Sequence, residues 1–269
     1  AIRSRLVSGV QPSALPIWSF EVEYRAPAYA RLPVQRGAAA RGDLTALRGT
    51  RAHLIVTFDR DLSALEADLP GGRTARWTAL TPRRWAGDVS IDQPGEYVLR
   101  ATAARKSPDA PGERRFPYRL TPVEDAAPVI TVRLPEGDVD LPTGQQVPVE
   151  VLAQDDLGLS ELKLQYRKDA DEPWTDLPLA GFPARPREAQ VTTRWDASPL
   201  ALLPGESATF RFELFDDNAF TGRGRAVSPT FELRFPSLAD LYERVDRRQA
   251  DAQTTLEKVA EQARELQKS

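Results

Sequence analysis

Acidic side chains gather in the turns of the second half of the chain, where they could bind a metal ion. Asp155-Asp156-Leu157-Gly158 follows one alternating apolar segment, and Asp216-Asp217-Asn218 follows another. Because Ca²⁺ prefers several carboxylate and carbonyl oxygens, such turns could form a calcium site at one end of a β-sandwich. Alternatively, Asp and Asn occur here because their side chains bond nearby backbone amides in turns. The candidate metal ligands are Asp125, Asp155, Asp156, Asp216, Asp217 and Asn218.

Five tryptophans raise a second chemical possibility, the binding of carbohydrate by exposed aromatic rings. Trp77 and Trp85 lie on neighbouring candidate strands, and Trp174 lies in a polar loop. Because β-sandwiches also bury tryptophan in their cores, the alternative for each residue is a role in packing. Trp18 and Trp195 fall within alternating strand patterns, so we predict that both belong to the core. The candidate glycan-binding residues are therefore Trp77, Trp85 and Trp174.

The residue types that usually carry catalysis are scarce in this sequence. There is no cysteine, which excludes thiolate nucleophiles, zinc–thiolate sites, iron–sulfur clusters and disulfides within the chain. His53 is the only histidine, and it lacks the sequence context of a Ser–His–Asp nucleophile. A hydrolase would need a histidine or carboxylate constellation at one end of a sandwich. We predict a non-enzymatic protein with no catalytic residues and, apart from the calcium considered above, no cofactor.

The composition is that of a globular protein rather than of a disordered chain. The 269 residues are 41% hydrophobic and 28% charged, and this length suits two domains of ordinary size. No run of about 18 apolar residues and no signal peptide is visible, so any membrane contact is expected through segments outside this chain. Methionine is absent even at position 1, from which we expect an excised fragment or a processed product.

Charge is distributed unevenly along the chain, although the net charge is only −3. Residues 1–121 carry 19 Lys/Arg and 12 Asp/Glu (+7), residues 122–236 carry 11 and 20 (−9), and residues 237–269 carry 6 and 7 (−1). A basic module and an acidic module could attract each other, or both could simply be solvated surfaces. The arginines are scattered through turns without a recognised nucleic-acid-binding motif, so we predict no nucleic-acid partner.

Short alternating segments dominate the first half of the chain and predict a β-sandwich. Residues 1–16 form a lead-in segment, and Trp18, Phe20, Val22 and Tyr24 then alternate with polar residues. Because the strand candidates are short, closely spaced and separated by turns rather than by amphipathic helices, we predict an immunoglobulin-like domain over residues 17–121. Further strands are expected at residues 53–58, 65–69, 76–80, 84–91, 96–103 and 116–121.

The same pattern of short alternating segments separated by turns repeats in residues 122–236, which we predict to be a second immunoglobulin-like β-sandwich. The boundary between the two domains is expected near residues 122–127, where Ala127-Pro128 precedes a new β-branched segment. The predicted fold class is therefore mainly β, with two tandem antiparallel sandwiches followed by a long C-terminal α-helix. Strands of the second domain are expected at residues 129–132, 147–153, 159–167, 190–195, 208–215 and 229–235.

Residues 237–269 contain no Pro or Gly and predict one long amphipathic helix. Ser237 is a good N-cap residue, and Asp240 lies three positions later, as in a capping box. Apolar residues recur every seven positions and form one narrow stripe, which must pack on another surface because a helix with so little apolar surface is marginal alone in water. The residues of this predicted interaction helix are Leu238, Val245, Leu256, Val259 and Leu266.

Several short sequence motifs, in this order along the chain, resemble those of a known family. They are Leu47-Arg48-Gly49-Thr50, Asp155-Asp156-Leu157-Gly158-Leu159-Ser160, Trp195-Asp196-Ala197-Ser198-Pro199-Leu200, Leu203-Pro204-Gly205-Glu206, Asp216-Asp217-Asn218 and Phe235-Pro236-Ser237-Leu238. Over residues 24–269 the chain resembles an uncharacterised bacterial family of large envelope proteins with N-terminal transmembrane helices, an extracytoplasmic immunoglobulin-like region and a long coiled-coil remainder. The resemblance implies a membrane-anchored protein on the periplasmic side of the inner membrane, and it supplies no catalytic residues.

From these features we predict a non-enzymatic spacer or protein-interaction module of a larger envelope protein. Its expected partners are other envelope proteins, or a second copy of the chain through the C-terminal helix, which would begin a stalk or assembly element. The alternative is a calcium-dependent adhesion module or a glycan-binding β-sandwich module.

Overall fold

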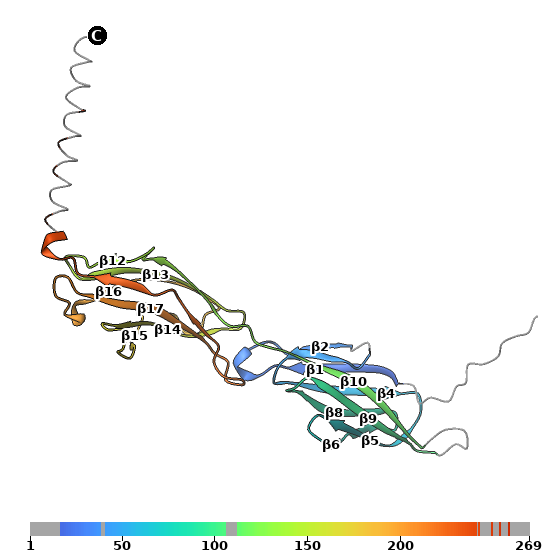
Figure 1. Cartoon of the computed structure of the whole chain (residues 1–269). Helices are drawn as coiled ribbons and strands as arrows, with labels where there is room; N and C mark the ends of the chain where they lie inside the picture. The colour runs from blue at the N-terminus through green and yellow to red at the C-terminus, as the bar shows by residue number, and fades with distance from the viewer. Residues whose placement is uncertain are drawn as a thin grey trace, which may run out of the picture. The chain divides into compact units, whose positions relative to one another are not determined.

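The computed structural model describes residues 17–38, 41–105 and 112–240, together with Tyr242, Gln249, Gln253 and Lys258 (Figure 1). The chain divides into two compact units. The first unit comprises Ala1–Asp125 and Asn218–Gly222, and the second unit comprises Ala126–Asp217 and Arg223–Ser269. Among the described residues we find no helix with the length and hydropathy of a membrane span.

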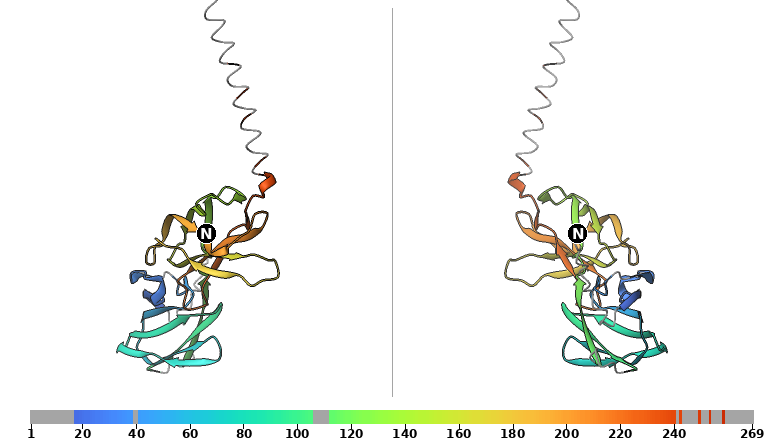
Figure 2. Two further views of the ribbon diagram at one scale, coloured as in Figure 1. Left: turned by 90° about the vertical axis from the view of Figure 1, so that its left-hand side faces the viewer. Right: turned by 90° about the vertical axis from the view of Figure 1, so that its right-hand side faces the viewer.

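The first unit, drawn in blue to green in Figure 2, is a sandwich of two β-sheets. The strand orders of these sheets are β2-β1-β4-β8-β7 and β3-β10-β9-β5-β6. If β1, β4, β7 and β8 are read as strands A, B, D and E, and β5, β9 and β10 as C, F and G, this is the strand order of immunoglobulin-type sandwiches. The structure therefore confirms the mainly β architecture. The strands are β1 (Ile17–Arg25), β2 (Gln35–Ala38), β3 (Leu44–Leu47), β4 (Thr50–Phe58), β5 (Leu62–Leu69), β6 (Arg73–Arg76), β7 (Thr78–Thr81), β8 (Arg84–Ile91), β9 (Gly95–Ala103) and β10 (Glu113–Val123).

Trp77 marks the point where the chain passes from one sheet of the first unit to the other. β6 pairs with β5, whereas β7 pairs with β8 in the opposite sheet. The side chain of Trp77 is 3% exposed, and its backbone N–H donates to the Leu65 carbonyl at 2.9 Å. The single strand predicted at residues 76–80 is therefore wrong, because a buried ring at its second position turns the chain between two layers.

The core of the first unit is built by alternation along its strands. In β4, Ala52, Leu54, Val56 and Phe58 are buried, while the residues between them are more exposed. Tyr97 is also fully buried, and its hydroxyl donates to the Gly42 carbonyl at 2.6 Å. Burial raises the pKa of Tyr97, so the hydroxyl stays protonated as a hydrogen-bond donor inside the core.

The second unit repeats the two-sheet plan, with strand orders β11-β13-β16 and β12-β19-β17-β14-β15. The short strand β18 pairs with Glu213–Phe215 of β17. With β11, β13 and β16 as strands A, B and E, and β14, β17 and β19 as C, F and G, the order again matches an immunoglobulin-type sandwich. The strands are β11 (Val129–Leu134), β12 (Val139–Asp140), β13 (Gln146–Gln154), β14 (Leu159–Arg167), β15 (Thr175–Pro178), β16 (Glu188–Asp196), β17 (Ser207–Asp216), β18 (Arg225–Val227) and β19 (Phe231–Arg234).

Aromatic rings fill the core of the second unit. Phe210 is fully buried, and its ring centroid lies 5.1 Å from that of Trp195 and 5.4 Å from that of Phe231. Tyr166 is the cross-strand partner of Phe210, and its ring centroid lies 5.9 Å from that of Trp195. The prediction that Trp195 belongs to the core is confirmed.

Trp18, in contrast, is 80% exposed, so its predicted place in the core is wrong. The pairing of β1 with β4 shifts register between Ile17 and Ser19, which leaves Trp18 as the bulged residue. A bulge adds one residue to a strand and interrupts the alternation of its side chains. Phe20 and Val22 follow the bulge, and both are buried as predicted.

A helical turn begins at Leu238, directly after the residue at which the capping pattern predicts a helix start. The Ser237 Oγ accepts from the Asp240 backbone N–H at 3.2 Å, and the Asp240 carboxylate accepts from the Ser237 backbone N–H at 2.9 Å. These reciprocal bonds are those of a capping box. Leu238 is helical and 64% exposed. The other residues of the predicted interaction helix, Val245, Leu256, Val259 and Leu266, lie outside the described part of the chain.

Candidate interaction surface

The outer face of the β14–β17 sheet in the second unit carries an extended polar network. On β14, residues Glu161, Lys163 and Gln165 alternate with the buried Leu162 and Leu164, so they point away from the core. The strand register places residues of β17, β15 and β18 beside them. We call this surface the polar face; it comprises Ser160, Glu161, Lys163, Gln165, Arg167, Trp174, Asp176, Arg211, Glu213, Phe215, Arg223 and Arg225.

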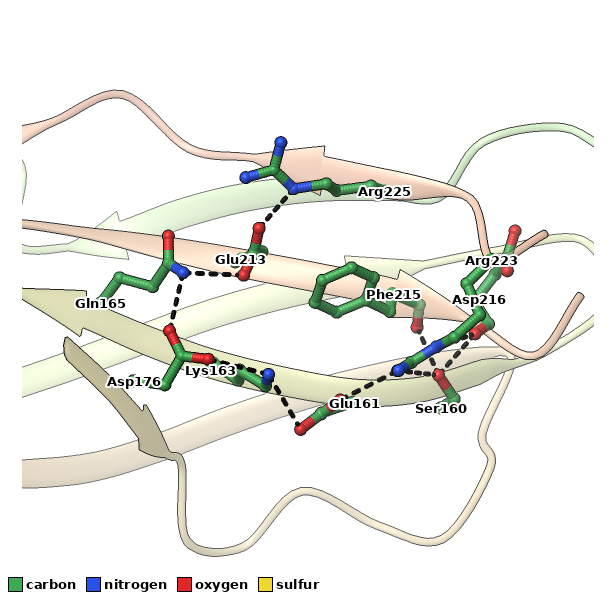
Figure 3. Close-up of polar contacts among 10 residues, drawn as sticks. All are labelled: Ser160, Glu161, Lys163, Gln165, Asp176, Glu213, Phe215, Asp216, Arg223 and Arg225. Carbon is green, nitrogen blue, oxygen red and sulfur yellow. Dashed lines mark hydrogen bonds and ion pairs between the residues drawn. The ribbon is translucent and has the colours of Figure 1, made fainter. Parts of the chain in front are cut away.

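Glu213 lies at the centre of the polar face and is only 4% exposed (Figure 3). Its carboxylate accepts from the Arg225 Nε and from the Gln165 Nε2, the latter at 2.9 Å. The same Gln165 amide donates to Asp176 at 2.8 Å, and its Oε1 accepts from the Arg211 Nε at 2.9 Å. A buried carboxylate is tolerated only where its oxygens are bonded, and here both are.

Lys163 extends the network along β14. Its ammonium group lies 2.9 Å from the Asp176 carboxylate and 3.4 Å from that of Glu161. The hydrogen bond from Lys163 to Asp176 raises the pKa of Lys163, and the bonds from Gln165 and Lys163 lower the pKa of Asp176. Both groups therefore stay charged across the physiological pH range.

Arg223 lies at one end of the network, where its guanidinium group packs on the Phe215 ring. Its guanidinium carbon lies 4.4 Å from the Phe215 ring centroid, and Lys163 lies 5.5 Å from the same ring. The Arg223 Nη2 also donates to the Ser160 Oγ at 2.7 Å and to the Glu161 carboxylate at 3.0 Å. The apolar ring thus supports two cations that are held by acidic neighbours (Figure 3).

Two of the three tryptophans considered for glycan binding are buried. Trp77 and Trp85 are 3% and 7% exposed and belong to the core of the first unit, because both indoles face inward between the sheets. Trp174 is half-buried, and its ring is contacted by the guanidinium groups of Arg167 at 4.5 Å and Arg211 at 4.1 Å. Its ring is therefore in contact with protein cations rather than presented as a bare surface for a sugar.

The acidic turns bond their own backbone. The Asp155 carboxylate accepts from the amides of Leu157 at 2.9 Å and Gly158 at 2.6 Å, and the Asn218 Oδ1 accepts from Phe220 and Thr221 at 3.0 Å. These are the local side-chain-to-backbone bonds of Asx turns. Burial, with the nearby negative charges of Asp156 and Asp216, raises the pKa of Asp155.

The six candidate metal ligands are divided between the two compact units. Asp125 and Asn218 belong to the first unit, whereas Asp155, Asp156, Asp216 and Asp217 belong to the second. Asp216 bonds the Gly224 amide at 2.8 Å, and Asp217 lies 3.5 Å from Arg185. Within the described ranges no three His, Asp or Glu residues are placed to hold a metal ion.

His53 pairs with Asp88 on the outer face of the β4–β8 ladder. Its Nδ1 lies 2.8 Å from the Asp88 carboxylate, and the two residues are direct cross-strand neighbours. Both side chains are substantially exposed. A triad would also need a hydroxyl bonded to the ring, and the described part of the chain places none there.

The sequence did not identify the polar face, although part of it was visible there. The charged and amide residues at positions 161, 163, 165 and 167 alternate with apolar residues, which indicates an outward-facing row on one strand. Their partners lie up to 62 residues away in the chain, and only the strand register brings them together.

Comparisons with known proteins place the chain in no family. No family model matches it, and no curated protein matches it. Among solved structures, it is similar to fibronectin(III)-like modules of Clostridium thermocellum CbhA, with a TM-score of 0.29, 12% identity, 74% of this chain covered and 92% of that one. It is also similar to an ICAM-5 D1–D4 ectodomain fragment, with a TM-score of 0.30 and 19% identity. That match covers 81% of this chain and 52% of the fragment. A third similar structure is that of a putative carbohydrate-binding protein from Bacteroides uniformis. Its TM-score is 0.28 and its sequence identity is 14%, with 65% of this chain and 90% of that chain covered.

Proposed function

We propose that this chain is a non-enzymatic spacer or protein-interaction module of a larger membrane-anchored envelope protein, on the periplasmic side of the inner membrane. The observation that carries the proposal is the passage from the last strand of the second sandwich, β19, into a capped helix start at Ser237. A β-sandwich that leads directly into a helix is arranged to join a folded module to a helical element.

Two surfaces support a role in binding other proteins. The polar face presents fixed charges on a rigid sheet, where partners are recognised by charge complementarity. The apolar stripe predicted for residues 237–269 begins at Leu238, which the sandwich leaves exposed. We propose that this stripe packs against a second copy of the chain or against another envelope protein.

We expect Val245→Asp combined with Val259→Asp to weaken self-association and lower the helix content. A charge in the apolar stripe would lose the packing that stabilises a long helix in water. Analytical ultracentrifugation and circular dichroism of the whole chain measure the two effects. Gln253→Asp adds one such charge outside the stripe and should change neither. An unchanged oligomeric state and helix content in the double variant would contradict the proposed role of the stripe.

The proposed location predicts a distinct pattern of protease sensitivity for the full-length protein in its native cells. Protease added to intact cells should leave both units uncut, and protease added after the outer membrane is opened should degrade them. Antibodies against the two units report the cleavage. Protection that persists until the inner membrane is lysed would place the module in the cytoplasm and reject the proposal.

A further inference from the structure

Two arginines on the polar face lack a carboxylate partner within the described residues. The Arg167 Nη1 donates to the Ala170 carbonyl, and the Arg211 Nε donates to Gln165, but neither guanidinium forms an ion pair there. Both lie against the ring of Trp174. The remaining Nη groups of both residues have no hydrogen-bond acceptor in the described structure.

Two carboxylates of the polar face, those of Glu213 and Asp176, are already bonded to other groups. Both oxygens of Glu213 are used, one by Arg225 and one by Gln165. Both oxygens of Asp176 are also used, one by Gln165 and one by Lys163. The carboxylates of the polar face therefore pair with Lys163, Arg223 and Arg225. The guanidinium groups of Arg167 and Arg211 remain available to bind an anion.

Trp174 holds the two guanidinium groups in one place. A guanidinium stacked on an indole keeps its N–H groups at the edge of its plane, where they match the two oxygens of a carboxylate. Fixing long side chains before binding also reduces the conformational entropy lost when a ligand arrives. The arrangement is thus suited to a planar anion.

The surrounding charge restricts the kind of anion that fits. Asp169, Asp171 and Glu172 are exposed in the loop before Trp174, and residues 122–236 carry 11 Lys/Arg against 20 Asp/Glu. A polyacidic chain would be repelled by this field. A single carboxylate with neutral neighbours would meet the arginines without that repulsion.

We propose that Arg167 and Arg211, held against Trp174, bind one Asp or Glu side chain presented by an otherwise neutral segment of a partner protein. This inference rests on the proposed function, since it names the chemistry of a partner for the interaction module. It goes beyond that function by assigning the contact to three residues of the β14–β15–β17 surface.

The test is an NMR titration of the whole chain with a capped peptide of Ser, Thr and Gly that contains one central Glu. We expect saturable shifts of the Trp174 indole and of the Arg167 and Arg211 Nε–H resonances, and none with a matched peptide that contains Gln. Arg167→Gln and Arg211→Gln should each weaken binding roughly tenfold, because charge-assisted bonds to a carboxylate are lost. Arg194→Gln, on β16 of the opposite sheet, should have no effect.

Each of the following outcomes would overturn the inference. Equal binding of the Gln peptide, or unchanged binding by a folded Arg167→Gln Arg211→Gln variant, would show that the arginines do not read the carboxylate. Saturation by inorganic phosphate, or binding only to vesicles of anionic phospholipid, without any response to the Glu peptide, would assign the site to phosphate. If no probe causes a response, the stacking of Arg167 and Arg211 on Trp174 only supports the structure of residues 168–174.

Different experiments test the proposed function and this inference, so either can be rejected while the other stands. The protease experiment tests where the protein lies, and the titration tests purified protein. A correct location with no peptide binding would reject only the arginine site, whereas peptide binding by a cytoplasmic protein would reject only the envelope function.

Discussion

Gly87→Ala is expected to lower the free energy of unfolding of the first unit by about 1–3 kcal/mol, the usual effect of overpacking a core. A Cβ at this position would lie 2.3–2.5 Å from three atoms of the Trp77 ring, well inside van der Waals contact. Trp77 is buried between the sheets where the chain changes layers, so the ring has no room to move away. Urea unfolding followed by tryptophan fluorescence measures the loss.

Gly37→Ala is the matched control, because Gly37 also lies in a strand of the same sheet. An added Cβ there meets no atom within 4 Å, and the backbone has no positive φ. We expect Gly37→Ala to leave the stability unchanged or slightly raised, since alanine restricts the unfolded chain more than glycine does. Equal effects of the two substitutions would show that the Trp77 contact does not set the stability of the first unit.

Phe210→Ala should destabilise the second unit by about 3–5 kcal/mol, as expected for removing a large buried ring. The ring packs against Trp195, Phe212 and Phe231 at centroid distances of 5.1, 6.1 and 5.4 Å. Its loss leaves a cavity lined by rigid aromatic groups that collapse poorly. Hydrogen exchange measured by mass spectrometry should show faster exchange in β14, β16 and β17.

The same experiment contains its own comparison, because peptides from the first unit report a separate core. Their exchange rates should stay close to those of the unmodified chain. Leu203→Ala, which truncates an exposed side chain of the second unit, should change stability by less than about 0.5 kcal/mol. Exchange that is unaltered by Phe210→Ala would mean that this aromatic group is not the centre of the core.

Strong alternation made the central strands predictable. The ranges expected at residues 84–91 and 159–167 coincide with β8 and β14, because apolar residues recur at every second position along part of each strand. The short strands β2, β15 and β18 were not predicted. All four residues of β15 are exposed, so no apolar period marks it, and it becomes a strand only by pairing with β14.

Tryptophan positions were the least predictable from sequence. Trp77 is buried by a change of sheet, and Trp18 is exposed by a bulge; neither event follows from the local residue pattern. The polar face was missed for a related reason. Gln165 and Glu213 are polar residues that the sequence places on the surface, and their burial depends on each other and on partners supplied by two other strands, β15 and β18.

The parallel pairs near the edges of both sandwiches constrain the order of events during synthesis. In the first unit, Leu44–Leu47 of β3 pairs with 120–123 of β10, and in the second, Val139–Asp140 of β12 pairs with 233–234 of β19. Contacts between such distant residues slow folding, and domains fold as units while the ribosome proceeds at about 5–20 residues per second. Each sandwich therefore waits, with an open edge, until its last strand has left the ribosome.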